Sequence, residues 1–119
     1  MTEKGIPFSI NSHIAYAEGS VVSKTIIDKK IGSITLFSFD AGQGLSEHTS
    51  PYDAVVQILD GKAVVTIGGT GREVASGEMI IMPAGIPHAL HATQRFKMML
   101  IMLRAETPQR EKDPPSIAV

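Results

Sequence analysis

Glycine and proline divide the middle of this chain into two segments, residues 42–61 and residues 77–92, each of which begins with glycine. The pair Asp60-Gly61 is typical of a tight turn between two strands, because glycine accepts a positive φ without steric cost. In the second segment, Pro83-Ala84-Gly85 combines a residue of restricted φ with a permissive one and predicts another sharp turn. Segments punctuated in this way favour short strands over helices.

The stretches between these turns have the composition of strands. They are short, rich in Val, Ile, Phe and Thr, and separated by Gly, Asp or Pro. No segment has apolar residues at helical spacing with caps over three turns. We expect a second tight turn at residues 68–71, and an all-β sandwich or barrel overall. The predicted strands cover residues 21–27, 33–39, 54–59, 63–67, 78–82, 88–92 and 96–103.

Length and charge narrow the class of protein. With 119 residues, the chain is long enough for one domain with a real core, which we place at residues 1–105. Residues 106–119 are polar and proline-rich and predict a flexible tail. A net charge of −1 with no basic run argues against nucleic-acid binding, and the apolar runs are too short to span a membrane. The absence of cysteine and of a signal pattern favours the cytoplasm.

One predicted strand is apolar on both faces. Residues 98–103 read Met-Met-Leu-Ile-Met-Leu, without the alternation expected of a strand that has one side in water. One face can pack inside a barrel, and the other needs a cover. That cover is either a second sheet of the same chain or a partner subunit. We favour the partner and expect a homodimer.

The spacing in the two segments resembles the two motifs of the cupin superfamily, and specifically the small single-domain cupins with one conserved barrel. Five residues separate Gly42 from His48, and six separate Ala54 from Gly61. The second motif is matched at Gly77, Pro83, Gly85 and His88. The resemblance spans about residues 31–103. It implies an all-β fold, the cupin double-stranded β-helix or jelly-roll barrel.

The resemblance implies a metal site that is only partly kept here. Family members bind a divalent metal with two histidines and a glutamate from the first motif and one histidine from the second. His48 and His88 keep two of these positions, whereas Ser50 and Ala54 occupy the others. Two imidazoles alone seldom hold such an ion tightly. If Mn, Fe, Ni or Zn binds at His48 and His88, water or a neighbouring side chain must complete its coordination. The neighbours are Glu47, Asp53 and Gln57, which strand alternation directs to the opposite face.

His48 and His88 are therefore the candidate catalytic residues of a pocket inside the barrel, since imidazole exchanges protons near neutral pH. Alternation along the strands predicts that Val56, Met82 and Leu90 line this pocket. The resemblance implies that Ser50 and Ala54 also face into it, and we expect Tyr52 to cap its mouth with the hydroxyl group. The expected partner is a small organic molecule. Three functions stay open at this point. They are metal-independent acid–base catalysis, binding or sensing without turnover, and a metal-dependent enzyme of the isomerase, lyase or dioxygenase type.

Overall fold

The computed structural model describes residues 2–104, and the predicted tail at residues 106–119 lies outside them. The described residues form eight strands and no helix, which confirms the all-β prediction. Accordingly, none of them belongs to a helix that could cross a membrane. The strands are β1 (Val21–Lys29), β2 (Gly32–Phe39), β3 (Gly44–His48), β4 (Asp53–Ile67), β5 (Thr70–Ala75), β6 (Met79–Met82), β7 (His88–His91) and β8 (Phe96–Leu103).

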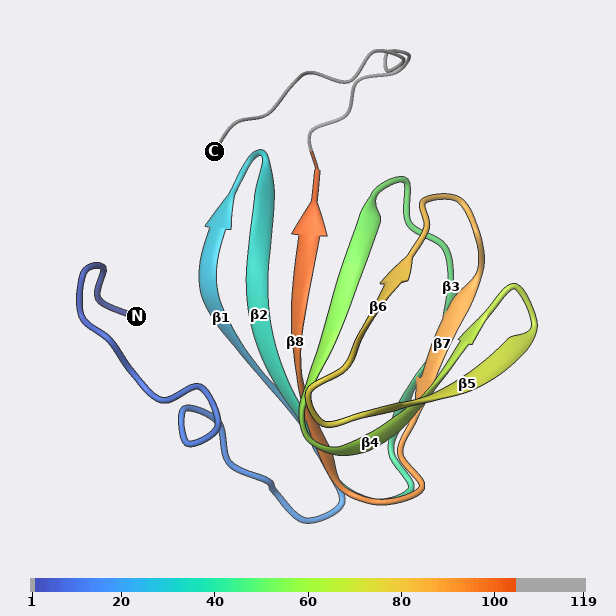
Figure 1. Cartoon of the computed structure of the whole chain (residues 1–119), viewed down its shortest axis with the longest axis horizontal. Coiled ribbons are helices and arrows are strands. Elements are labelled where there is room, and N and C mark those ends of the chain that lie inside the picture. The colour runs from blue at the N-terminus through green and yellow to red at the C-terminus, as the bar shows by residue number, and fades with distance from the viewer. Residues whose placement is uncertain (1, 105–119) are drawn as a thin grey trace.

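All strand pairs are antiparallel, and together they curl into an open barrel (Figure 1). The hydrogen-bonded order is β1-β2-β8-β4-β7-β3, and β5 and β6 also pair with β4. The first part of β4 lies between β8 and β6, and its second part lies between β5 and β7. A single long strand therefore joins the two halves of the barrel.

The predicted turn at Asp60-Gly61 is wrong, because β4 continues through it as one strand. Its register against β8 shifts between Ile58 and Asp60, so a β-bulge lies just before the glycine, which itself pairs with Phe96. Gly61 has φ +74°, and a Cβ atom there would lie 2.2 Å from the carbonyl oxygen of Arg95. Only glycine permits this backbone approach. The local signal for glycine was correct, but a glycine with positive φ is found inside a bulged strand as well as in a hairpin.

The second predicted turn is confirmed. Ile67 pairs with Thr70 across a two-residue loop, and both loop residues, Gly68 and Gly69, have positive φ. Strands β3 and β5 were not predicted from the sequence. Both are short, and most of their residues are exposed, so they lack the apolar alternation that identifies a half-buried strand.

Side chains on the concave face of the sheet form the main core. Phe39 and Phe96 stack at its centre with ring centroids 4.4 Å apart, and both are fully buried. Val56, Val65 and Met98 belong to the same buried cluster. The main core therefore joins side chains from β2, β4 and β8.

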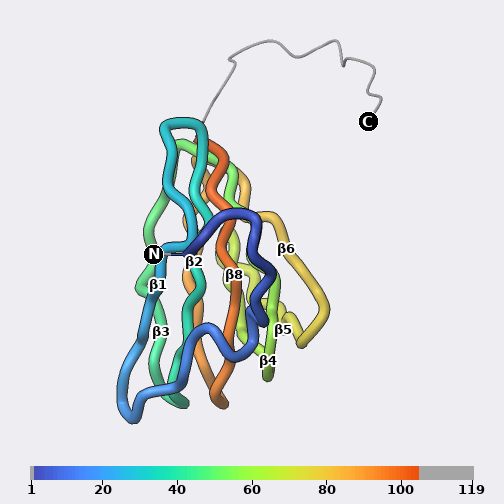
Figure 2. The backbone as a smooth tube through the Cα atoms, turned by 90° about the vertical axis from the view of Figure 1, so that its left-hand side faces the viewer, coloured from blue at the N-terminus to red at the C-terminus, as the bar shows by residue number. Residues whose placement is uncertain are grey.

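The N-terminal segment before β1 covers part of the convex face, running alongside the sheet (Figure 2). Ile14 is only 4% exposed and packs with Leu36 and Leu59 in a second cluster, which Met99 borders. Lys97 donates a hydrogen bond to the carbonyl oxygen of Asn11 at 2.6 Å. Part of the two-sided apolar strand is thus covered within the same chain, by a segment that the sequence did not identify as a cover.

Candidate functional site

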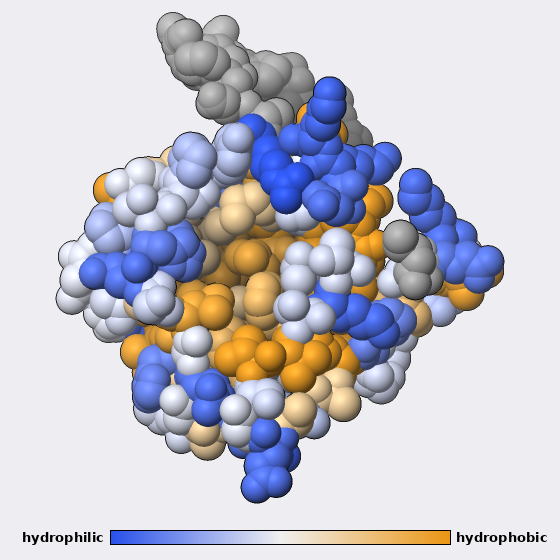
Figure 3. Space-filling model, turned by 180° about the vertical axis from the view of Figure 1, so that it is seen from behind, coloured by the Kyte–Doolittle hydropathy of each residue, from blue (hydrophilic) through white to orange (hydrophobic). Residues whose placement is uncertain are grey.

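A cavity of about 50 Å³ lies inside the barrel, where it has room for about four water molecules. Five strands, β3, β4, β6, β7 and β8, and the loop after β3 form its wall, which is almost entirely apolar. Its lining residues are Leu45, His48, Ser50, Ala54, Met82, His88, Leu90, Met98, Leu100 and Met102. Hydrophobic side chains also line a hollow on the face opposite to that of Figure 1, with a hydrophilic rim around it (Figure 3).

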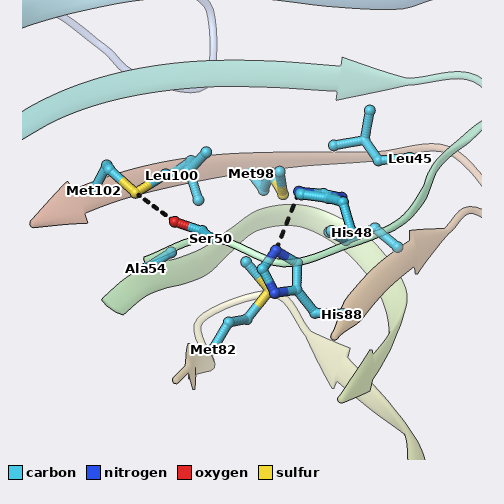
Figure 4. A pocket seen from close by; sticks show the side chains of 10 residues that line it. Leu45, His48, Ser50, Ala54, Met82, His88, Met98, Leu100 and Met102 are labelled. Carbon is cyan, nitrogen blue, oxygen red and sulfur yellow. Dashed lines mark hydrogen bonds between the residues drawn. The ribbon is translucent and has the colours of Figure 1, made fainter. Parts of the chain in front are cut away.

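The two histidines of the motifs meet in this cavity (Figure 4). Their Nε2 atoms are 3.2 Å apart, and their rings meet edge to face with centroids separated by 4.4 Å. His88, at the start of β7, is buried, whereas His48, at the end of β3, is exposed. The pair therefore connects the interior of the cavity with its mouth.

A register shift brings the two histidines together. Leu45 of β3 pairs with Leu90 of β7, and uninterrupted pairing would place Glu47 opposite His88. The register shifts by one residue between Leu45 and His48, so that His48 occupies that position instead. A polar imidazole replaces a carboxylate at the cavity as a result.

The Nδ1 atoms determine what the facing Nε2 atoms can do. His48 Nδ1 lies 2.8 Å from the carbonyl oxygen of Ser46, and His88 Nδ1 lies 3.3 Å from that of Ile86. A carbonyl oxygen only accepts, so each contact is a hydrogen bond when Nδ1 carries the proton. In that tautomer, both Nε2 atoms present lone pairs to each other. Two lone pairs at this distance attract a proton, a donor group or a cation between them.

The environment keeps His88 neutral. Burial lowers the pKa of His88 below its ordinary value of 6.5, and the neighbouring His48 lowers it further. The carbonyl of Ile86 acts in the opposite direction by accepting a hydrogen bond. A neutral imidazole with an unprotonated Nε2 is a base and a ligand, and it is the form that this site favours.

Of the other six predicted pocket residues, four line the cavity: Ser50, Ala54, Met82 and Leu90. Two do not. Val56 is fully buried in the main core, and Tyr52 lies beside the cavity, where its backbone N–H donates to Ser50 Oγ at 3.1 Å. Four lining residues are outside that set: Leu45, Met98, Leu100 and Met102. Alternation along β8 from Met98 would have identified the last two, since both lie on the same face of that strand.

The residues present do not fit the divalent metal site of the resemblance. Among residues 2–104, no three His, Cys, Asp or Glu side chains gather as metal ligands would. Glu47, Asp53 and Gln57 are absent from the cavity lining. Asp53 Oδ1 instead accepts a hydrogen bond from the backbone N–H of Ala84 at 2.9 Å, which holds the loop between β6 and β7.

Known proteins resemble the chain over most of its length. Residues 35–103 match the family model of the cupin domain. A conserved protein of unknown function from Streptococcus pyogenes shares 38% identity and a TM-score of 0.83, over 89% of this chain and 93% of that one. A cupin 2 conserved barrel domain protein from Leptotrichia buccalis shares 38% identity and a TM-score of 0.79, over 81% of this chain and 47% of that one.

A further relative, an uncharacterized protein of Streptomyces coelicolor, is 34% identical over 70 residues, which cover 59% of this chain and 67% of that protein. The solved structures confirm the barrel fold that the two glycine-framed segments predicted.

Proposed function

The chain belongs to the cupin family, and from this we propose that its barrel cavity binds a small organic molecule at His48 and His88. The observation that carries the proposal is the pair of imidazole Nε2 atoms 3.2 Å apart in an otherwise apolar cavity. Buried polar atoms need partners. A hydroxyl or acid group of a ligand supplies the hydrogen that the two facing lone pairs lack.

The wall chemistry describes the rest of the ligand. Leu90, Met82 and Met98 offer flexible and apolar contacts, which favour a compact carbon skeleton with one polar end. A cavity of about 50 Å³ limits the enclosed part to a few heavy atoms. Larger molecules extend past His48 to the mouth, where that ring is exposed.

The same geometry supports proton transfer. His88 is held neutral and accepts a proton from the ligand at Nε2, and His48, within hydrogen-bond distance, receives or returns it from the exposed side. This chemistry needs no metal. A protein that binds the same ligand without turnover uses the same contacts, so product analysis separates an enzyme from a binding or sensing module.

The experiment is a thermal-shift screen of hydroxy acids, keto acids, aromatic acids and sugars, followed by product analysis of each compound that binds. A ligand at about 100 times its Kd stabilises the native state by about 2.7 kcal/mol. We expect His48→Ala and His88→Ala to abolish the shift. His91→Ala is the matched control, because His91 lies on the same strand and is exposed. A shift that survives the double substitution at His48 and His88 overturns the proposal.

We also propose that the chain works in the cytoplasm as a homodimer. One row of apolar residues crosses five adjacent strands on the convex face, in register: Ile27, Ile34, Ile101, Val55 and Ile81. None of them is fully buried, and Ile81 is 59% exposed. A continuous β-branched row of this kind is typical of a surface that pairs with a partner. In a symmetric dimer, the second copy of the chain packs the same row of apolar residues against this one.

A further inference from the structure

Sulfur is the unexpected element of the cavity. Three of its lining residues are methionines, Met82, Met98 and Met102, contributed by β6 and β8. Figure 4 shows Met82 extending toward the ring of His88, and Met98 ending beside His48. Met102 Sδ has a separate partner, because Ser50 Oγ donates to it at 3.9 Å. Two thioethers and two imidazoles therefore converge on one small space.

We propose that His48, His88, Met82 and Met98 form a binding site for a soft monovalent metal ion, Cu(I). The proposal goes beyond the binding of an organic molecule and does not depend on it. The divalent-metal site of the cupin family uses a carboxylate and a third histidine, and both are missing from this cavity. Cu(I) instead suits the side chains that are present.

The histidine geometry is that of a metal-binding pair. Two nitrogen ligands at about 2.0–2.1 Å from a tetrahedral ion are about 3.3–3.4 Å apart. The two Nε2 atoms are separated by 3.2 Å. Both Nδ1 atoms lie against backbone carbonyl oxygens, those of Ser46 and Ile86, which is how ligand histidines are oriented toward a metal. A cation between the Nε2 atoms also satisfies the facing lone pairs.

The charge of the ion and its preference for sulfur ligands determine which metal this site favours. No carboxylate lines the cavity, so nothing there compensates an ionic charge. The free-energy cost of moving an ion out of water grows with the square of its charge. Desolvation of a divalent ion therefore costs about four times as much as that of a monovalent one. Thioether sulfur prefers Cu(I) over Mn(II), Fe(II) or Zn(II). Neutral ligands, an apolar wall and sulfur all favour the same ion.

The test is an anaerobic titration of the untagged protein with Cu(I) in competition with the chromophoric chelator bicinchoninate. We expect one equivalent of copper per chain, sulfur scattering in the X-ray absorption spectrum of the bound copper, and no displacement by excess Zn(II). Met82→Leu and Met98→Leu conserve volume and remove only the sulfur. Each should weaken binding by more than the roughly 10- to 100-fold loss typical of an outer-shell partner.

Met79→Leu is the matched control, because Met79 lies three residues from Met82 on the same strand but is 56% exposed. It should bind copper as the unsubstituted chain does. Circular dichroism and thermal melting establish that each variant is folded. Uptake below about one-tenth equivalent, displacement by Zn(II), or unchanged affinity in the double methionine variant each overturns the proposal.

The proposal of an organic ligand and the proposal of a copper ion can each be rejected without rejecting the other. The thermal-shift screen is run on metal-free protein with a chelator present, and the copper titration is run without any organic compound, so each measurement tests one proposal. If no organic ligand is found and copper binds through sulfur, the copper site stands alone. If ligands bind and copper does not, only the proposal for the metal is rejected.

Discussion

His48 stands opposite His88 because the β3–β7 register shifts by one residue after Leu45. The imidazole contact therefore depends on a backbone irregularity as well as on the two side chains. Burial of the His88 ring lowers its pKa in the folded chain, so protonation of the site is coupled to folding.

We expect stability to fall as the pH is lowered through the region below 6.5. The pKa of His88 is lower in the folded protein than its ordinary value of 6.5. Between these two pKa values the unfolded chain binds more protons, so the free energy of unfolding rises with pH. The contribution is fully present above 6.5 and is lost as the pH falls toward the folded pKa. Urea denaturation from pH 5 to pH 8 measures it.

His88→Gln removes the titrating group, and its stability should depend less on pH in the same window. His91→Gln is the control, since it removes an exposed histidine from the same strand. Equal pH dependence in the unsubstituted chain and in His88→Gln contradicts this account.

Gly61→Ala should destabilise the protein by more than Gly69→Ala. Both glycines have positive φ, which costs an alanine about 1–2 kcal/mol. At Gly69 nothing lies within 4 Å of the added Cβ, whereas at Gly61 the Cβ meets the Arg95 carbonyl at 2.2 Å. Comparison of denaturation midpoints tests this, and similar losses at both positions disprove the close approach.

Ile14→Ala should cost about 2–4 kcal/mol, because truncation of a buried isoleucine loses contacts and leaves a cavity. Ile6→Ala serves as the control, since Ile6 is in the same segment but is 58% exposed. Chemical denaturation gives both values. A loss below 1 kcal/mol at Ile14 would mean that the N-terminal segment does not cover the sheet in solution.

Ile81→Lys should convert the proposed dimer into a monomer without unfolding it. Ile81 ends the apolar row and is 59% exposed, so a lysine there is solvated in a single chain and is buried only in a pair. Sedimentation equilibrium at tens of micromolar distinguishes the two states. Ile86→Lys, in the loop before β7, should leave association unchanged. A monomeric unsubstituted chain refutes the dimer.

The sequence predicted the barrel because its turns use residues with few alternatives. Gly68 and Gly69 close a hairpin, and Pro83-Ala84-Gly85 separates β6 from β7. The error at Asp60-Gly61 has a physical origin. A glycine with positive φ is found inside a bulged strand as well as in a turn, and the close approach to the Arg95 carbonyl comes from a distant part of the sequence.

The site was predicted less completely than the fold. The two motifs identified His48 and His88, and alternation identified Met82 and Leu90. Tyr52 was placed at the mouth without a local signal, and Val56 follows the same alternation as Ala54 but lies deeper, in the core. The distance between the histidine nitrogens follows from the register of β3 against β7, which no local pattern specifies.

The long strand β4 also has a consequence for the order of events in synthesis. It hydrogen-bonds with β5, β6, β7 and β8, and all four follow it in the chain. The β1–β2 hairpin, which is made first, is joined to β4 only through β8. Contacts between residues so distant in sequence form slowly. During translation, therefore, the β1–β2 hairpin has no strand to connect it to β4 until β8 is made. The barrel cannot close until Leu103, the last residue of β8, has left the ribosome.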